Sequence, residues 1–170
     1  RRGAEFITPI PKPRKQKKAA AKQAAMVFDE GAGLSTDKQQ YDTTGTINLI
    51  RNYVDTWRMI PDPNDWKVTP ETARLLQHWR SYPFTSIRPF FCQVEAVETL
   101  IWLTEVAPKM GKREKELLDR LGSASAEANP GLARIALKMA TGSGKTTVMA
   151  MIIAWQTINS LRYPTSKKYT

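Results

Sequence analysis

The sequence contains little cysteine, little histidine and no long apolar run. Cys92 is its only cysteine among 170 residues, which excludes an intrachain disulfide and is typical of a reducing compartment, so we expect a cytoplasmic protein. The longest strongly apolar run, from Val148 to Trp155, has eight residues, whereas a helix that crosses a bilayer needs about 20. The basic start also lacks the apolar region of a signal peptide. We therefore expect no membrane partner.

Acidic residues are fewer than basic residues, and the difference is largest at the start of the chain. The chain has 26 lysines and arginines against 16 aspartates and glutamates. Residues 1–23 hold eight of the basic residues against Glu5 alone, with prolines and few large apolar side chains. This composition predicts a flexible arm. Such an arm either contacts nucleic-acid phosphates or is only a solvated linker, and the sequence leaves both open.

No cluster of metal ligands stands out. The one histidine, His78, has no second candidate ligand nearby, so we expect it on the surface of a helix. Asp29 and Glu30 form an acidic pair, but they lie in a turn-rich stretch without the apolar strand that should precede a magnesium-binding pair. We therefore assign no metal to them.

Helical periodicity is what the middle of the chain does contain. Apolar residues recur at helical spacing over residues 47–60, and Thr69 followed by Pro70 predicts the start of a second helix. A third helix of about 18 residues is predicted between Pro89 and Pro108. Its predicted apolar face is Val94, Val97, Ile101 and Trp102, and its glutamates Glu95, Glu98 and Glu105 are expected to fall mostly elsewhere.

A different pattern follows in residues 132–160. Ile135, Leu137 and Met139 suit a buried strand, which ends at the glycine-rich turn "TGSGKT". The chain then reads as a helix that is apolar on nearly all sides. A strand, a glycine turn and a helix form the context in which Gly-x-Gly-Lys-Thr is credible as a phosphate-binding loop.

Each residue type of this turn has a chemical use. Gly142 and Gly144 allow the backbone to curl so that N–H groups point at a phosphate, beside the positive end of the new helix. Lys145 can reach the β- and γ-phosphates, and the Thr146 hydroxyl can ligate Mg²⁺. The alternative is a plain strand-to-helix turn, but the motif arises by chance in roughly one chain of this length in a hundred.

Met139 departs from the full motif, which has glycine six residues before the lysine. The sequence Met-Ala-Thr-Gly-Ser-Gly-Lys-Thr instead resembles motif I of superfamily 2 helicases and translocases, especially the helicase subunits of type I and type III restriction enzymes. The stretch "FFCQVEAVETLIWLTEVAP" resembles the segment before motif I in Res-subunit-like proteins. The resemblance extends over residues 45–160.

The resemblance also implies how a base is chosen. It assigns adenine recognition to Gln93, because a carboxamide accepts from adenine N6 and donates to N7 at once, which favours ATP over GTP. The alternative is an ordinary glutamine on a helix surface, and Arg88 ranks below Gln93 as a base contact. The candidate nucleotide-binding residues are Gln93, Thr141, Gly142, Ser143, Gly144, Lys145, Thr146 and Thr147, with Lys145 and Thr146 catalytic and Thr146 on the metal.

The expected organisation has four segments. Residues 1–45 form the arm and a turn-rich lead-in, 46–108 a helical region with the adenine-reading helix, and 109–132 a charged connection with one short surface helix. Residues 133–170 begin an α/β, RecA-like P-loop domain with its first strand, P-loop and first helix. Because the chain starts with arginine and shows no second acidic motif after the P-loop, we expect it to be part of a longer protein.

The resemblance implies an ATP- and Mg²⁺-dependent helicase or translocase subunit of a type III-like restriction endonuclease. Its partners would be double-stranded DNA and a methyltransferase subunit. By itself the chain is expected to bind nucleotide weakly and not to hydrolyse it. Two other hypotheses stay open: a DNA-binding module with a vestigial P-loop, and a P-loop ATPase of another class.

Overall fold

The structure, a computed structural model, describes residues 43–85 and 88–169. The basic arm of residues 1–23 and the pair Asp29 and Glu30 lie outside these residues. The chain divides into two compact units, residues 1–52 and 53–170, and the division falls within helix α2 (Thr43–Arg58). In the first unit the described residues are the initial turns of α2. The helix predicted over residues 47–60 is confirmed, with its start a few residues earlier.

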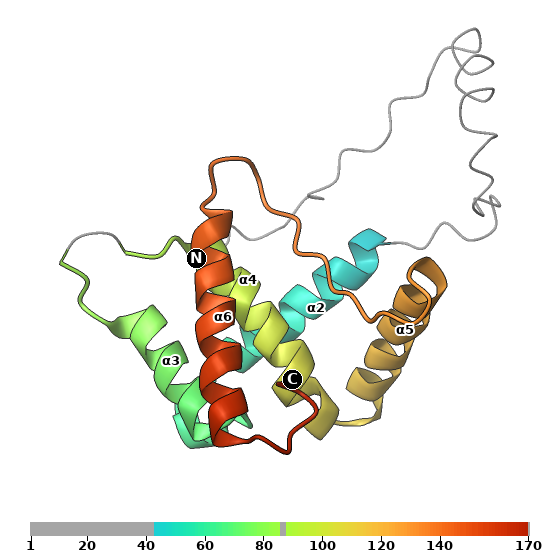
Figure 1. Cartoon of the computed structure of the whole chain (residues 1–170), viewed down its shortest axis with the longest axis horizontal. Coiled ribbons are helices and arrows are strands. Elements are labelled where there is room, and N and C mark those ends of the chain that lie inside the picture. Colours follow the sequence, from blue (N-terminus) through green and yellow to red (C-terminus); the bar gives the residue numbers. More distant parts are fainter. Residues whose placement is uncertain (1–42, 86–87, 170) are drawn as a thin grey trace, which may run out of the picture. The chain divides into compact units, whose positions relative to one another are not determined.

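The second unit is built from helices (Figure 1). No strand occurs in either described range, and none of the helices there has the length and hydropathy to span a bilayer. Helix α6 packs against both α3 and α4. The elements after α2 are η2 (Pro63–Trp66), α3 (Pro70–Ser81), α4 (Phe91–Ile101), the π-helical turn η3 (Trp102–Val106), η4 (Ala107–Lys109), α5 (Lys112–Ala128) and α6 (Lys145–Arg162).

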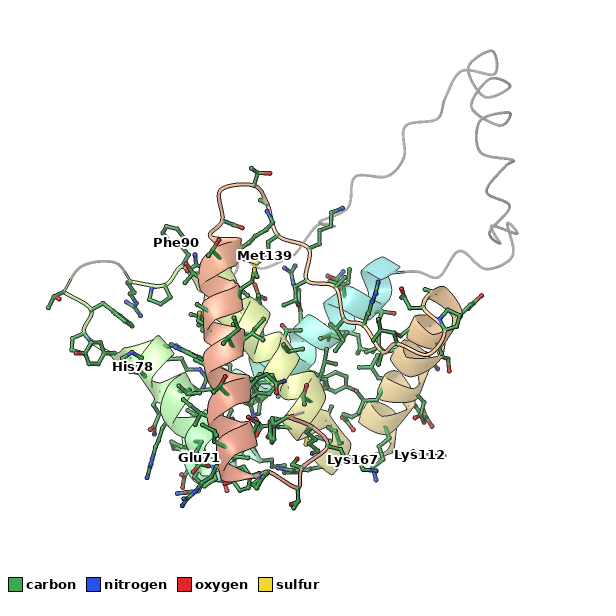
Figure 2. The ribbon with its side chains drawn as sticks, viewed as in Figure 1. Glu71, His78, Phe90, Lys112, Met139 and Lys167 are labelled. Carbon is green, nitrogen blue, oxygen red and sulfur yellow. The ribbon has the colours of Figure 1, made fainter. Side chains whose placement is uncertain are left out.

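Helix α3 starts where its sequence predicts. The Thr69 hydroxyl accepts a hydrogen bond from the Thr72 backbone N–H at 3.1 Å, and Pro70 occupies the first turn, where its missing N–H costs nothing. Leu76 and Trp79 are buried on the inner face of the helix. His78 is exposed on the outer face, as expected, and its ring packs 4.6 Å from that of Tyr82 (His78 is labelled in Figure 2).

The helix predicted between Pro89 and Pro108 is also formed, as α4 continued by η3 and η4. Val97, Ile101 and Trp102 are buried, as the apolar spacing predicts. The prediction for the glutamates was wrong: all three are buried too, on or beside the same face. They are Glu95, Glu98 and Glu105.

Glu98 is buried because two arginines satisfy its carboxylate. Arg58 donates through Nε at 2.7 Å and also through Nη2, and Arg80 donates through Nε at 2.7 Å. The Arg80 guanidinium also lies over the Trp66 ring, 4.5 Å from its centroid. Burial alone would lower the pKa of Arg58, but the hydrogen bond and the negative charge of Glu98 act in the opposite direction. Together they outweigh burial, so the pKa of Arg58 is raised. The ion cluster thus joins α2, α3 and α4 through charge-assisted hydrogen bonds.

Glu105 is buried by a different set of donors. Its carboxylate accepts from the Thr69 backbone N–H at 2.7 Å, the Thr72 hydroxyl at 2.7 Å and the Trp155 indole N–H at 2.8 Å. Asn159 donates to the same Thr72 hydroxyl at 3.0 Å. Because these groups come from α3, η3 and α6, the network fixes the position of the middle of α6 relative to the rest of the unit.

The strand predicted over residues 132–140 is not formed. These residues run as an irregular segment between α5 and α6 (Figure 1), and Ile135, predicted to be buried, is 58% exposed. Leu137 and Met139 are only half-buried. A strand needs a neighbour for its N–H and C=O groups, and the described part of the chain supplies no second strand. The fold of the described residues is therefore helical, and it does not show the predicted strand–P-loop start of a RecA-like domain.

Candidate functional site

The glycine-rich turn before α6 folds around one carbonyl oxygen. The Ala140 oxygen accepts from the Ser143 N–H at 3.3 Å, the Ser143 hydroxyl at 2.7 Å and the Lys145 Nζ at 3.0 Å. Gly142 and Gly144 have φ angles of 78° and 77°, in the left-handed region that glycine adopts readily and other residues rarely do. The two glycines therefore allow the tight reversal that leads the chain into α6.

The N-terminal end of α6 has donors to spare. Gly144 is the N-cap and, lacking a side chain, makes no side-chain hydrogen bond to the first turn. The first backbone N–H groups of a helix have no partner within the helix, and the helix dipole adds positive potential at the same place. Lys145, Thr146 and Thr147 are exposed here. The end of the helix can therefore accept an anion without displacing any side-chain cap.

These residues fit a nucleotide phosphate with its magnesium ion. Lys145 is exposed and is held only by a hydrogen bond to a backbone carbonyl, so its ammonium can exchange that carbonyl for a phosphate oxygen. Thr146 presents a hydroxyl next to it. The described residues contain no group of three or more histidine, cysteine, aspartate or glutamate side chains that could hold a metal. A magnesium ion here would depend on Thr146, phosphate oxygens and water, which is a common arrangement for Mg²⁺.

Gln93 lies directly against this turn. It is the third residue of α4 and is 4% exposed, which excludes the alternative of an ordinary surface glutamine. Its Oε1 accepts from the Phe90 N–H at 2.9 Å, and its Nε2 donates to the Ser143 carbonyl at 2.9 Å. Two candidate residues that are 50 positions apart in the sequence are thus brought into contact.

Phe90 and Arg88 lie close to Gln93 in the sequence. Phe90, labelled together with Met139 in Figure 2, is 60% exposed. Arg88 donates from Nη2 to the carbonyl of Arg80 at 3.1 Å, near the end of α3. The ranking of Arg88 below Gln93 as a base contact stays a prediction.

Sequence reasoning missed the groups that hold α6 in place. Glu98 and Glu105 are separated by seven residues, which is two helical turns, so they share one side of a helix with the apolar residues between them. Two carboxylates in register with an apolar stripe are a signal of buried acids that need donors. Asn159 likewise follows Trp155 by one turn on the buried face of α6. The spacing of these residues could have indicated that they are buried, but it does not identify the distant donors that they bond.

A protein-family model matches part of the chain. Residues 86–163 match the family described as type III restriction enzyme, res subunit. This match confirms the expected family resemblance over these residues, and it includes both Gln93 and the glycine-rich turn. No curated protein and no solved structure matches the chain.

Proposed function

We propose that this chain is the ATP-binding portion of a DNA helicase or translocase subunit of a type III-like restriction endonuclease. The main support is the geometry of the turn: two glycines at positive φ lead into an uncapped helix end with an exposed lysine and threonine. The family match over residues 86–163 supports the restriction-enzyme context. The same context implies duplex DNA as substrate and a modification methyltransferase as partner.

The residues of the turn have distinct roles in this proposal. Bound ATP with Mg²⁺ supplies the phosphoryl group whose transfer to water releases the energy for movement on DNA. The N–H groups at the start of α6 would orient the phosphates, and Lys145 would place its positive charge against the phosphate oxygens. Thr146 holds the metal through its hydroxyl. The chain contributes positioning and charge, which account for most of the catalysis in phosphoryl transfer.

The experiment that tests the proposal is nucleotide titration of the purified chain with Lys145→Ala. We expect Mg-ATP affinity to fall at least tenfold, because the variant loses a charge-assisted contact to phosphate. Lys138→Ala is the matched control: it removes an equal charge from an exposed lysine seven residues earlier. Equal losses in the two variants would mean that only general positive charge is sensed. No loss in either would favour a vestigial P-loop in a DNA-binding module.

A further inference from the structure

The contact between Gln93 and the turn has consequences beyond base recognition. A carboxamide can accept two hydrogen bonds at oxygen and donate two at nitrogen. In the structure one of each is already used within the protein, to the Phe90 N–H and the Ser143 carbonyl. One lone pair and one N–H remain, and an adenine edge requires one of each, because it offers a donor at N6 and an acceptor at N7.

The two protein partners also fix which way the amide points. The Phe90 N–H requires an oxygen opposite it, and the Ser143 carbonyl requires a nitrogen. Reversing the amide of Gln93 would set donor against donor and acceptor against acceptor. The oxygen lone pair and the N–H that remain on Gln93 therefore keep fixed positions, which match N6–H and N7 of adenine. Guanine presents two acceptors, O6 and N7, and would need two donors from the protein.

The turn is also shaped to receive this side chain. A Cβ added to Gly144 would lie 2.1 Å from Nε2 of Gln93, a distance that no pair of non-bonded atoms tolerates. A residue with a Cβ at position 144 would therefore be strained by the φ of 77° and would also have to displace the amide of Gln93. Since Gly144 is also the N-cap of α6, the amide contacts the turn at the point where the helix begins.

From these contacts we infer that Gln93 is a positioning residue for the phosphate-binding turn as well as a reader of the base. Its hydrogen bond to the Ser143 carbonyl holds the turn in the curled form that presents the first N–H groups of α6. A single side chain thereby ties base recognition to the geometry of the phosphate site. The inference rests on the proposed function and adds a second role to one of its residues.

The decisive probe is inorganic tripolyphosphate, which has the phosphates of ATP and no base. Gln93→Met keeps the length and neutrality of the side chain but removes both hydrogen bonds. We expect this variant to bind Mg-tripolyphosphate about three- to tenfold more weakly, the effect of losing one neutral hydrogen bond. Gln77→Met, the same change at an exposed position of α3, should have no effect. Weaker ATP binding with unchanged tripolyphosphate binding would overturn the positioning role.

A second measurement needs no ligand and separates this inference from the proposed function. Amide hydrogen exchange of the ligand-free chain reports the Ser143 N–H, which donates to Ala140, and the Thr147 N–H, which donates to Gly144. Gln93→Met should speed exchange at both by about three- to tenfold and leave α3 unchanged. If the wild-type protein binds neither ATP nor tripolyphosphate, the proposed function fails. Amide hydrogen exchange then still tests whether Gln93 positions the turn. Unchanged exchange at the turn would overturn it.

The contact between Gln93 and Gly144 can be tested with Gly144→Ala and Gln93→Ala, made singly and together. The quantity measured is the rate of amide hydrogen exchange at Ser143. The new methyl group of Gly144→Ala displaces the amide of Gln93 and breaks its hydrogen bond. Once that bond is lost, adding Gln93→Ala should change the exchange rate by less than it does in the wild type. Strictly additive effects would show that the two residues do not act through their contact, and would contradict the inference.

Discussion

Glu98→Gln should destabilise the second unit far more than the loss of an exposed charge. The Glu98 side chain is 1% exposed, and its arginine partners Arg58 and Arg80 are 22% and 16% exposed. The substitution keeps the volume but leaves the Arg80 guanidinium without its ion-pair partner and Arg58 with Asp55 as its remaining ion-pair partner. Removal of one member of a buried ion pair costs about 3–5 kcal/mol. Because both arginines keep some access to water, we expect about 3 kcal/mol, at the lower end of that range.

Urea unfolding followed by tryptophan fluorescence measures this loss, because Arg80 lies over the rings of Trp57 and Trp66 and unfolding exposes them. A loss of about 3 kcal/mol corresponds to a melting temperature lower by roughly 10 °C for a unit of this size. Glu116→Gln is the control, because its pair with Lys112 spans 3.9 Å with side chains 52% and 91% exposed. Such a pair contributes about 0–1 kcal/mol. If Glu98→Gln and Glu116→Gln shift the midpoint equally, the ion cluster does not stabilise the fold and the reasoning is refuted.

Four further predictions follow from the same structure. Gln93→Ala should narrow the preference for ATP over GTP by about 1–3 kcal/mol in competitive titrations, and an unchanged preference would remove its role in base choice. Deletion of residues 1–23 should weaken binding to all DNA sequences alike and flatten the plot of log affinity against log salt, whereas an unchanged slope would make the arm a linker. The hydrogen bond from Tyr163 lowers the pKa of Glu71, so the pair stabilises the fold above the ordinary pKa of 4.5 and this stabilisation is lost as pH falls through the lowered pKa. Tyr163→Phe should therefore destabilise the fold at neutral pH and have little effect in acid. A loss of stability that does not depend on pH would count against the pair. The chain alone should release no phosphate from ATP with Mg²⁺ and duplex DNA, and steady release that disappears in Lys145→Ala would prove this wrong.

Local signals in the sequence predicted most of the helices correctly. The N-cap at Thr69 and the apolar spacing before Pro108 act within a few residues of chain, so they can be read without knowing the fold. The helical spacing of Val97, Ile101 and Trp102 also predicted their burial. Helix positions depend on this local chemistry, which explains the success.

What failed depends on partners that are distant in the sequence. Ile135 alternates with its neighbours as a strand does, yet a strand forms only when another strand pairs with it. The burial of Glu98 and Glu105 requires donors from other elements, such as Arg58, 40 residues away, and Trp155, 50 residues away. At the site, the sequence selected Gln93 and the glycine turn separately. Neither sequence motif by itself predicts that Gln93 and the turn are in direct contact.

The close approach of Gln93 to Gly144 bears on how this motif would change over evolutionary time. Lys145 and Thr146 are exposed, so a descendant that had abandoned nucleotides could replace them at little cost to the fold. Gly144 could not be replaced so freely, because its φ of 77° strains any other residue and a Cβ there would displace the amide of Gln93. A decayed copy of this gene would therefore keep its second glycine long after its lysine had drifted. Among descendants, the lysine rather than the glycine is the residue that would distinguish a working loop from a relic.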